Sequence, residues 1–353
     1  MSGNGTVPRI AIVGSAVAMA LAMIIAAPRA QAQTAPEFYK DKRIELVISS
    51  TVGGGNDLSA RLIARHFSAN MPGAPSIVPR NMPGAGGVTA ANHLYNIAPR
   101  DGLAIGMVQN SALFEPLFGN DKAMFDVAKI NWLGSPSKDV GVLILWHAVP
   151  VDSMAEAQKR GLMLGVSGGL NATPAFYARV LGHVFDMPVK MIAGYPGQAE
   201  AFLALERGEN EGYPSVFWSS LKVVKPDWIR DKKIKMLVHF GDKPHPELAG
   251  VPFALDLIRD TDKRSLMAVA SAPLAVGRPI LAPPEIPADR VRALQAALAA
   301  TLRDPQYLAE CGKQNLECND PTSGAELAKI IADTYNAPAP LVAKLRELNN
   351  AVR

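Results

Sequence analysis

Cysteines, histidines and clusters of positive charge are scarce in this chain. Its 353 residues include two cysteines and six scattered histidines, with no run of lysine or arginine. Two cysteines without a nearby histidine do not make a zinc site, and no pair of histidines has the H-E-x-x-H spacing. The glycine-rich stretches are not followed by Gly-Lys-Ser/Thr, which excludes a phosphate-binding P-loop. We therefore expect no metal, no cofactor and no nucleic-acid partner.

Long apolar runs are also rare, and the one present lies at the N-terminus. Ile10–Ala27 carries no charge, and Ala30-Gln31-Ala32 places small residues at the alternate positions that signal peptidase requires. This predicts a signal peptide over residues 1–32 and a mature, soluble protein that starts at Gln33 in the periplasm. An uncleaved anchor is the alternative, because 18 apolar residues could just span a bilayer. Removal of residues 1–32 lowers the formal charge from +4 to +2, since the segment contains Arg9 and Arg29 and no acidic residue.

The two cysteines are Cys311 and Cys318, close together near the C-terminus. In an exported chain a disulfide is the default interpretation, and closing so short a loop contributes about 2–3 kcal/mol. Two buried thiols that never meet remain the alternative. In both cases the role is structural.

Strands and helices are expected to alternate along the chain. Arg43–Ser50 is rich in Ile, Leu and Val, and Asp57 can cap the helix that follows it. The same unit recurs as a strand at Leu162–Val166 and a helix at Ala175–Phe185, and a further strand is expected at Leu274–Leu281. Hydrophobic residues make up 48% and charged residues 19%, so the chain can bury a large core, and its length suits two domains. These features predict an α/β fold with parallel layers.

Two glycine-rich turns follow strands at equivalent places in the two units. In open α/β sheets, ligands bind beyond the carboxyl ends of strands, where glycines let the backbone approach a ligand and the free N–H groups of a helix N-terminus suit an anion. The turns could face each other across a cleft. The candidate ligand-binding residues are Thr51, Val52, Gly53, Gly54, Gly55, Asn56 and Asp57 in the first turn, and Ser167, Gly168, Gly169, Asn171, Ala172 and Thr173 in the second.

Several motifs spread in order over the mature chain resemble those of one family. The resemblance is to the substrate-binding proteins of tripartite tricarboxylate transporters, often called Bug proteins. The matching segments are Phe38–Ile44, Gly53–Arg61, Asn81–Gly87, Ala98–Gly102, Gly194–Gly197, Leu205–Glu209 and Ala282–Pro287.

This resemblance implies a two-lobed periplasmic binding protein of the Venus-flytrap type, each lobe a mainly parallel sheet flanked by helices. Lobe one would comprise residues 33–138 plus 273–353, and lobe two residues 139–272. It further implies a monomer without enzymatic activity that binds a small organic carboxylate through the two turns. Tyr195 stands where the family's Tyr-x-Gly turn begins, and Ser215 lies near its acidic strand end, so both join the candidate ligand-binding residues. The partner would be the membrane permease subunits or, alternatively, a membrane sensor.

Departures from the family pattern leave the ligand open. Thr51-Val52 replaces the usual pair before the glycines, Pro196 replaces a Lys, and Asn210–Pro214 lacks a characteristic Asp. Trp218, close to this segment, could stack on an aromatic acid or be a core residue.

An exported serine hydrolase is the rival hypothesis. Gly165-Val166-Ser167-Gly168-Gly169 fits the G-x-S-x-G pattern of a nucleophile elbow after a strand. A triad in that fold needs an acid and then a histidine further along the chain. The only histidines after Ser167 are His183, His239 and His245, and no His-Gly-Gly segment precedes it. The missing partners favour binding over catalysis.

Overall fold

The computed structural model describes residues 1–3, 35–170 and 172–350. The predicted cleavage site and nearly all of the predicted signal peptide lie outside these residues, as does Asn171 of the second turn. Among the helices of the described part, none combines the length and the apolar character needed to cross a membrane.

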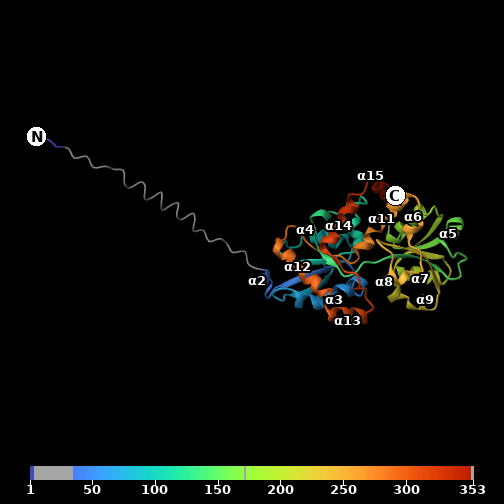
Figure 1. Cartoon of the computed structure of the whole chain (residues 1–353), viewed down its shortest axis with the longest axis horizontal. Coiled ribbons are helices and arrows are strands. Elements are labelled where there is room, and N and C mark those ends of the chain that lie inside the picture. Colours follow the sequence, from blue (N-terminus) through green and yellow to red (C-terminus); the bar gives the residue numbers. More distant parts are fainter. Residues whose placement is uncertain (4–34, 171, 351–353) are drawn as a thin grey trace.

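Two sheets, each with its own helices, form the two halves of the molecule (Figure 1). We call the half with the six-stranded sheet lobe one; its strand order is β11-β4-β10-β3-β1-β2. The strands are β1 (Arg43–Ile48), β2 (Ser76–Asn81), β3 (Ala104–Met107), β4 (Asn131–Ser135), β10 (Ile280–Ala282) and β11 (Thr322–Ser323). The helices are α2 (Ala35–Tyr39), α3 (Gly55–Asn70), α4 (Val88–Asn96), α12 (Ala288–Thr301), α13 (Pro305–Lys313) and α14 (Gly324–Tyr335), with short 3₁₀ turns at Ala85–Gly87, Asn110–Phe114 and Val127–Lys129.

Lobe two is built on a five-stranded sheet with the order β7-β6-β8-β5-β9. Its strands are β5 (Gly141–Trp146), β6 (Leu162–Ser167), β7 (Val189–Tyr195), β8 (Gly212–Phe217) and β9 (Ile234–Phe240). Its helices are α5 (Met154–Arg160), α6 (Thr173–Val184), α7 (Gln198–Glu206), α8 (Trp218–Val224), α9 (Pro226–Arg230), α10 (Ala254–Leu257) and α11 (Thr261–Val276), with a 3₁₀ turn at Pro246–Leu248. The last helix, α15 (Ala339–Asn350), packs against α6 and α11, and its Arg346 donates a hydrogen bond to Leu117 O of lobe one.

Both faces of the central strands are buried. In β1, Ile44, Leu46 and Ile48 pack in one apolar cluster with α3 and α12, while Val47 faces a second cluster with α4. A strand covered by helices on both faces carries a near-continuous apolar sequence, which is what RIELVI provides. The fold is therefore α/β, as the sequence predicts.

Both sheets combine parallel and antiparallel pairs of strands. β1 pairs in parallel with β2 and β3, and β6 with β7 and β8. The strands beside the crossovers, β10 in lobe one and β5 in lobe two, pair antiparallel with both neighbours. The βαβ units repeat within each lobe, but the segments that pass between lobes enter the sheets in the opposite direction. The alternation of elements along the sequence does not reveal this reversal.

Two predicted elements near the C-terminus have different bounds in the structure. The expected strand over Leu274–Leu281 is divided between the end of α11 and the short β10, with a turn at Gly277 between them. The sequence from Gly324 to Asn349 also predicts one long helix. The structure instead has two, α14 and α15, separated around Pro338, because proline cannot donate to the preceding turn of a helix.

Ion pairs join the two lobes along one side. Lys222 Nζ on α8 lies 2.6 Å from Glu317 Oε1 of lobe one, and Lys243 Nζ lies 2.8 Å from Asp320 Oδ2. At the crossover, Lys138 bonds both Asp242 and Glu326, which holds β4, the end of β9 and α14 together. These contacts link the loop after α13 to lobe two.

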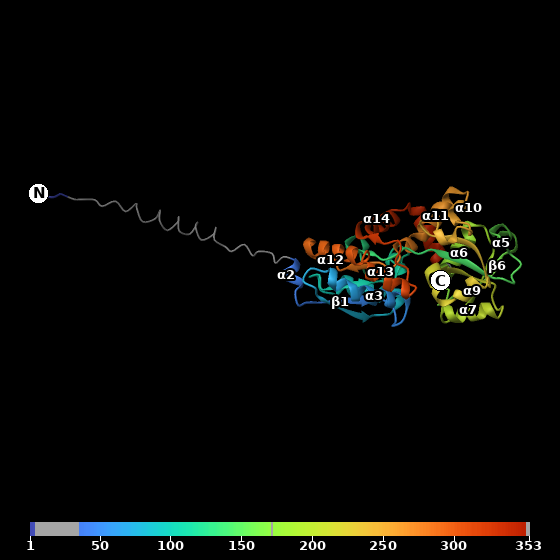
Figure 2. The same ribbon diagram turned by 60° about the horizontal axis from the view of Figure 1, so that its bottom comes forward.

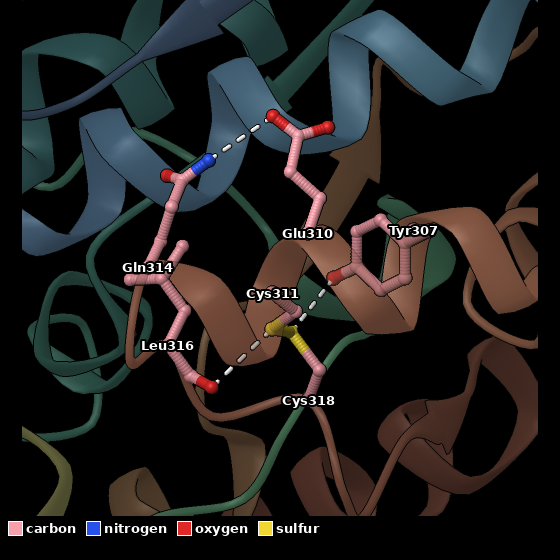
Figure 3. The surroundings of a disulfide bond; sticks show 6 residues. All are labelled: Tyr307, Glu310, Cys311, Gln314, Leu316 and Cys318. Carbon is pink, nitrogen blue, oxygen red and sulfur yellow. Dashed lines mark hydrogen bonds between the residues drawn. A yellow bond between two sulfur atoms is a disulfide. The ribbon is translucent and has the colours of Figure 1, made fainter.

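That loop is closed by a disulfide between Cys311 and Cys318 (Figure 3). The hydroxyl of Tyr307 lies 3.2 Å from the Cys318 sulfur, and both cysteines are buried. Glu310, on the same helix, pairs with Arg65 and with His66 of α3. The disulfide therefore fixes the segment that carries Glu317 toward lobe two.

Candidate functional site

Two pockets lie where the lobes meet, and Gln109 lines both of them. The first, of about 260 Å³, is bounded in lobe one by the start of α3 and in lobe two by Phe217 and Ser220; Asp139 and Arg278, on the crossovers, complete it. The second, of about 400 Å³, is bounded by Ala85–Gly86 and the 110–114 turn of lobe one, the N-terminal end of α6 in lobe two, and the end of α15. The two glycine-rich turns thus open onto adjoining pockets between the lobes.

The first turn runs from the end of β1 into α3. Thr51, Val52 and Gly53 are exposed, and Gly54 and Gly55 line the first pocket together with Asn56. Gly53 has a φ of +83°, a conformation that a residue with a side chain rarely adopts. The first amides of α3 have no acceptor within their own helix, so the pocket receives donors from the helix N-terminus.

Asp57 holds this turn in place rather than capping the helix. Its carboxylate is 1% exposed and accepts hydrogen bonds from Gly53 N (2.9 Å), Asn81 Nδ2 (2.8 Å) and Arg61 Nε (2.8 Å). Asn81 Nδ2 also donates to Ser50 O at 2.9 Å. Burial by itself would raise the pKa of Asp57, but these bonds and the charge of Arg61 outweigh it and lower the pKa. Both carboxylate oxygens are thus used within lobe one.

The second turn connects β6 to α6. Gly168 and Gly169 have positive φ values, and Gly168, Ala172 and Thr173 line the second pocket. Arg179 on α6 donates to Leu170 O of the turn and to Asn349 O of α15, which ties the turn to the end of the chain. The second turn therefore has a different support from the first, which depends on Asp57.

Ser167, the candidate nucleophile, is bonded to a phenol and not to a base. It is buried, and its Oγ lies 2.8 Å from the Tyr213 hydroxyl. Burial raises the pKa of Tyr213 to about 12, so the phenol is neutral at physiological pH. A nucleophile elbow needs a base in hydrogen-bond contact with the serine. The hydrogen bond of Ser167 gives no support to the hydrolase hypothesis.

Two further sequence candidates, Tyr195 and Ser215, are not part of the pocket linings. Tyr195 contacts Asn210 Nδ2 at 3.5 Å, and Ser215 is buried with no partner for its Oγ among the described residues. Trp218 is 5% exposed, belongs to the core of lobe two, and donates to Glu247 Oε2 at 2.7 Å. Its structural setting is that of a core residue.

Sequence reasoning missed Gln109 and Arg278. Gln109 follows β3, and its backbone N–H donates to Ser49 Oγ at 2.7 Å. This bond fixes Gln109 beside the first turn. Arg278 follows the crossover glycine Gly277, and only the folded chain brings it to the start of α3. A sequence signal exists for Gln109, because it directly follows the apolar run Leu103–Val108, which predicts a strand. No such signal exists for Arg278.

Neither a cavity elsewhere in lobe one nor any cluster of metal-ligating side chains in the described residues competes with the interlobe pockets. A larger cavity of about 650 Å³ lies within lobe one between β4, α12 and α14, away from both turns. In the described part of the chain, no three His, Cys, Asp or Glu side chains are grouped so that they could hold a metal ion. The pockets between the lobes are therefore the candidate site.

Two lobes whose glycine-rich turns open onto pockets between them are the arrangement of a two-lobed periplasmic solute-binding protein. Comparison with known proteins leads to the same class. Residues 60–347 match the family described as "Tripartite tricarboxylate transporter family receptor". The chain belongs to this family, as its motifs predict.

Individual relatives resemble the chain over nearly its whole length. A protein of Cupriavidus necator, described as "UPF0065 protein in gbd 5'region", is 27% identical over 95% of this chain and 96% of its own. A TctC solute binding protein from Polaromonas, crystallised without ligand, is 18% identical and has a TM-score of 0.68 over 89% of this chain and all of its own. The R. palustris protein Rpa4515 with adipate is 20% identical, with a TM-score of 0.62 over 86% of this chain and 97% of its own. At these identities the structures show the fold.

Proposed function

We propose that the mature protein is a periplasmic receptor that captures a small carboxylated organic anion between its lobes and delivers it to the membrane subunits of a tripartite transporter. The observation that supports this most strongly is the pair of turns that open, from opposite lobes, onto adjoining pockets. Helix N-termini and glycine amides on both sides suit a carboxylate. The adipate bound by the R. palustris protein is an anion of this class.

Capture would follow the usual thermodynamics of a two-lobed receptor. Ligand shifts the chain toward the closed state only by as much as it binds that state more tightly than the open one. A ligand that contacts the first turn and the second at once has such a preference, because an open cleft would separate them. The candidate contacts are the amide of Gly55 at the start of α3, the hydroxyl of Thr51 and the hydroxyl of Thr173. The amides of Gly53 and Gly54 are already bonded within the turn, to Asp57 and to Thr51 O.

Thermal unfolding of residues 33–353 against acetate, benzoate, malate, adipate and citrate tests the proposal. Ligands that bind only the folded state raise its stability, by about 2.7 kcal/mol at a hundredfold excess over the dissociation constant. We expect at least one carboxylate to raise the midpoint strongly, and an equal concentration of sodium chloride to leave it unchanged. A flat response to all five at millimolar concentration, together with esterase activity that a Ser167→Ala variant loses, would replace the receptor by a hydrolase.

A further inference from the structure

The side chain of Arg278 in the first pocket has N–H donors that no described residue accepts from. The side chain of Arg278 lines this pocket and is partly buried. Its guanidinium makes no hydrogen bond or ion pair with any residue that the structure describes; only its backbone N–H is bonded, to Ser135 Oγ at 3.0 Å. A guanidinium carries five N–H donors in a planar fork, and leaving them without acceptors in a pocket is costly. Arg278 is therefore poised to bind an anion.

The guanidinium lies at the start of α3. Arg278 Nη2 is 3.4 Å from the position that a Cβ on Gly55 would occupy, so the missing side chain of Gly55 leaves room for it. The Oγ of Ser50, which lines the same pocket, is buried without a partner among the described residues. An anion placed here would meet the arginine fork, the helix amides and this hydroxyl together.

Asp139 carries the opposite charge, but no hydrogen bond joins it to the guanidinium of Arg278. Asp139 also lines the pocket and attracts Arg278, but its oxygens accept hydrogen bonds from Val140 N at 2.9 Å, from Ser219 N at 3.4 Å and from Ser219 Oγ. Asp139 therefore holds the N-terminal end of α8 with its carboxylate oxygens, and burial raises the pKa of this carboxyl. The guanidinium of Arg278 therefore keeps its donors beside Gly55 without an acceptor among the described residues.

We propose that Arg278 forms an ion pair with a carboxylate of the ligand in the first pocket. The inference rests on the proposed function and adds to it the residue that selects a charged carboxylate over its neutral amide. A pocket of about 260 Å³ holds one end of a small acid, and the rest of the ligand extends past Gln109 toward the second turn. Because Phe217 and Ser220 of lobe two line the same pocket, a ligand bound to Arg278 also contacts the other lobe.

The test compares Arg278→Gln and Arg278→Lys with wild type by calorimetric titration. The probes are those of the five carboxylates that bind the wild type, each paired with its uncharged primary amide. Arg292→Gln is the control, because Arg292 is exposed on α12 and lines neither pocket. We expect Arg278→Gln to weaken carboxylate binding at least tenfold, Arg278→Lys to restore part of it, and Arg292→Gln to change nothing.

The amides separate an ion pair from a change of pocket shape. We expect Arg278→Gln to leave amide binding nearly unchanged, so that the preference for carboxylate over amide falls by about the same factor as carboxylate affinity. Equal losses for acid and amide, or wild-type affinity in Arg278→Gln, would overturn the role of Arg278 while the receptor function stands. Absence of carboxylate binding by the wild type would overturn both proposals.

Discussion

An Asp57→Asn variant is expected to unfold about 2–3 kcal/mol more easily than the wild type and to bind its carboxylate at least about tenfold more weakly. The asparagine keeps the shape of the side chain but loses its charge. The carboxylate accepts hydrogen bonds from three N–H donors, and the NH₂ group of the asparagine would face at least one of these donors without being able to accept from it. The turn from Thr51 to Gly55 would then lose its tie to Arg61 and Asn81. Urea unfolding and calorimetric titration measure the two effects.

Asp304→Asn is the matched control for this variant. Asp304 caps α13 through a bond from Gln306 N at 2.8 Å and lines neither interlobe pocket. Asparagine caps a helix about as well as aspartate does, so this substitution should change the free energy of unfolding by less than about 1 kcal/mol and leave affinity unchanged. If Asp57→Asn destabilises the chain but leaves affinity unchanged, the first turn is not part of the site.

The contribution of Asp57 also depends on pH in a defined direction. Because its pKa in the folded chain is lowered, the charged carboxylate stabilises the fold at pH values above the unfolded pKa of about 3.9. This stabilisation is lost as pH falls through the lower, folded pKa. The stability difference between wild type and Asp57→Asn should therefore be largest at neutral pH and shrink in acid; a constant difference down to the acid limit would contradict the assignment.

Gly277→Ala is expected to have the largest effect on stability, a loss of roughly 2–6 kcal/mol from backbone strain and overpacking combined. Gly277 ends α11 with φ of 65° and ψ of −117°, a conformation that disfavours a side chain. A Cβ there would also lie far inside contact distance of the Ser137 carbonyl oxygen, on the other crossover. Since Arg278 follows directly, the variant that still folds should also bind carboxylate more weakly.

Gly250→Ala provides the comparison for the substitution at the crossover glycine, Gly277. Gly250 lacks a positive φ, and no described atom lies within 4 Å of the position of its Cβ, so this substitution should change the free energy of unfolding by less than about 1 kcal/mol. Urea unfolding of both variants measures the difference between their free energies of unfolding. A Gly277→Ala variant as stable as Gly250→Ala would show that the crossover tolerates a side chain and does not fix the position of Arg278.

The sequence predicts the α/β fold and the two turns because both depend on local patterns. A buried strand, a glycine-rich turn and a helix with one apolar face can be recognised within about 25 residues, as at Arg43–Phe67. Sheet order and strand direction depend on where the chain crosses between lobes, and no local pattern encodes that. The antiparallel β5 and β10 belong to this class. The break between α14 and α15 does not, because Pro338 marks it in the local sequence.

The candidate site likewise contains residues that local sequence patterns reveal and residues that they do not. The turn residues could be predicted, but the role of Asp57 could not, because its partner Asn81 is on β2 and helix caps are usually assigned from neighbouring residues alone. Arg278 reaches Gly55 only after the chain has passed through all of lobe two and returned. Its importance is electrostatic and geometric, and it has no motif that would distinguish it from a surface arginine.

The most direct test of a ligand bound between the lobes is hydrogen–deuterium exchange of residues 33–353 with and without the carboxylate that most raises the unfolding midpoint. We predict slower exchange in both turns, at residues 51–58 and 166–175, and at the crossover around residues 277–279. Protection confined to one lobe, or centred on the cavity between β4, α12 and α14, would contradict the account.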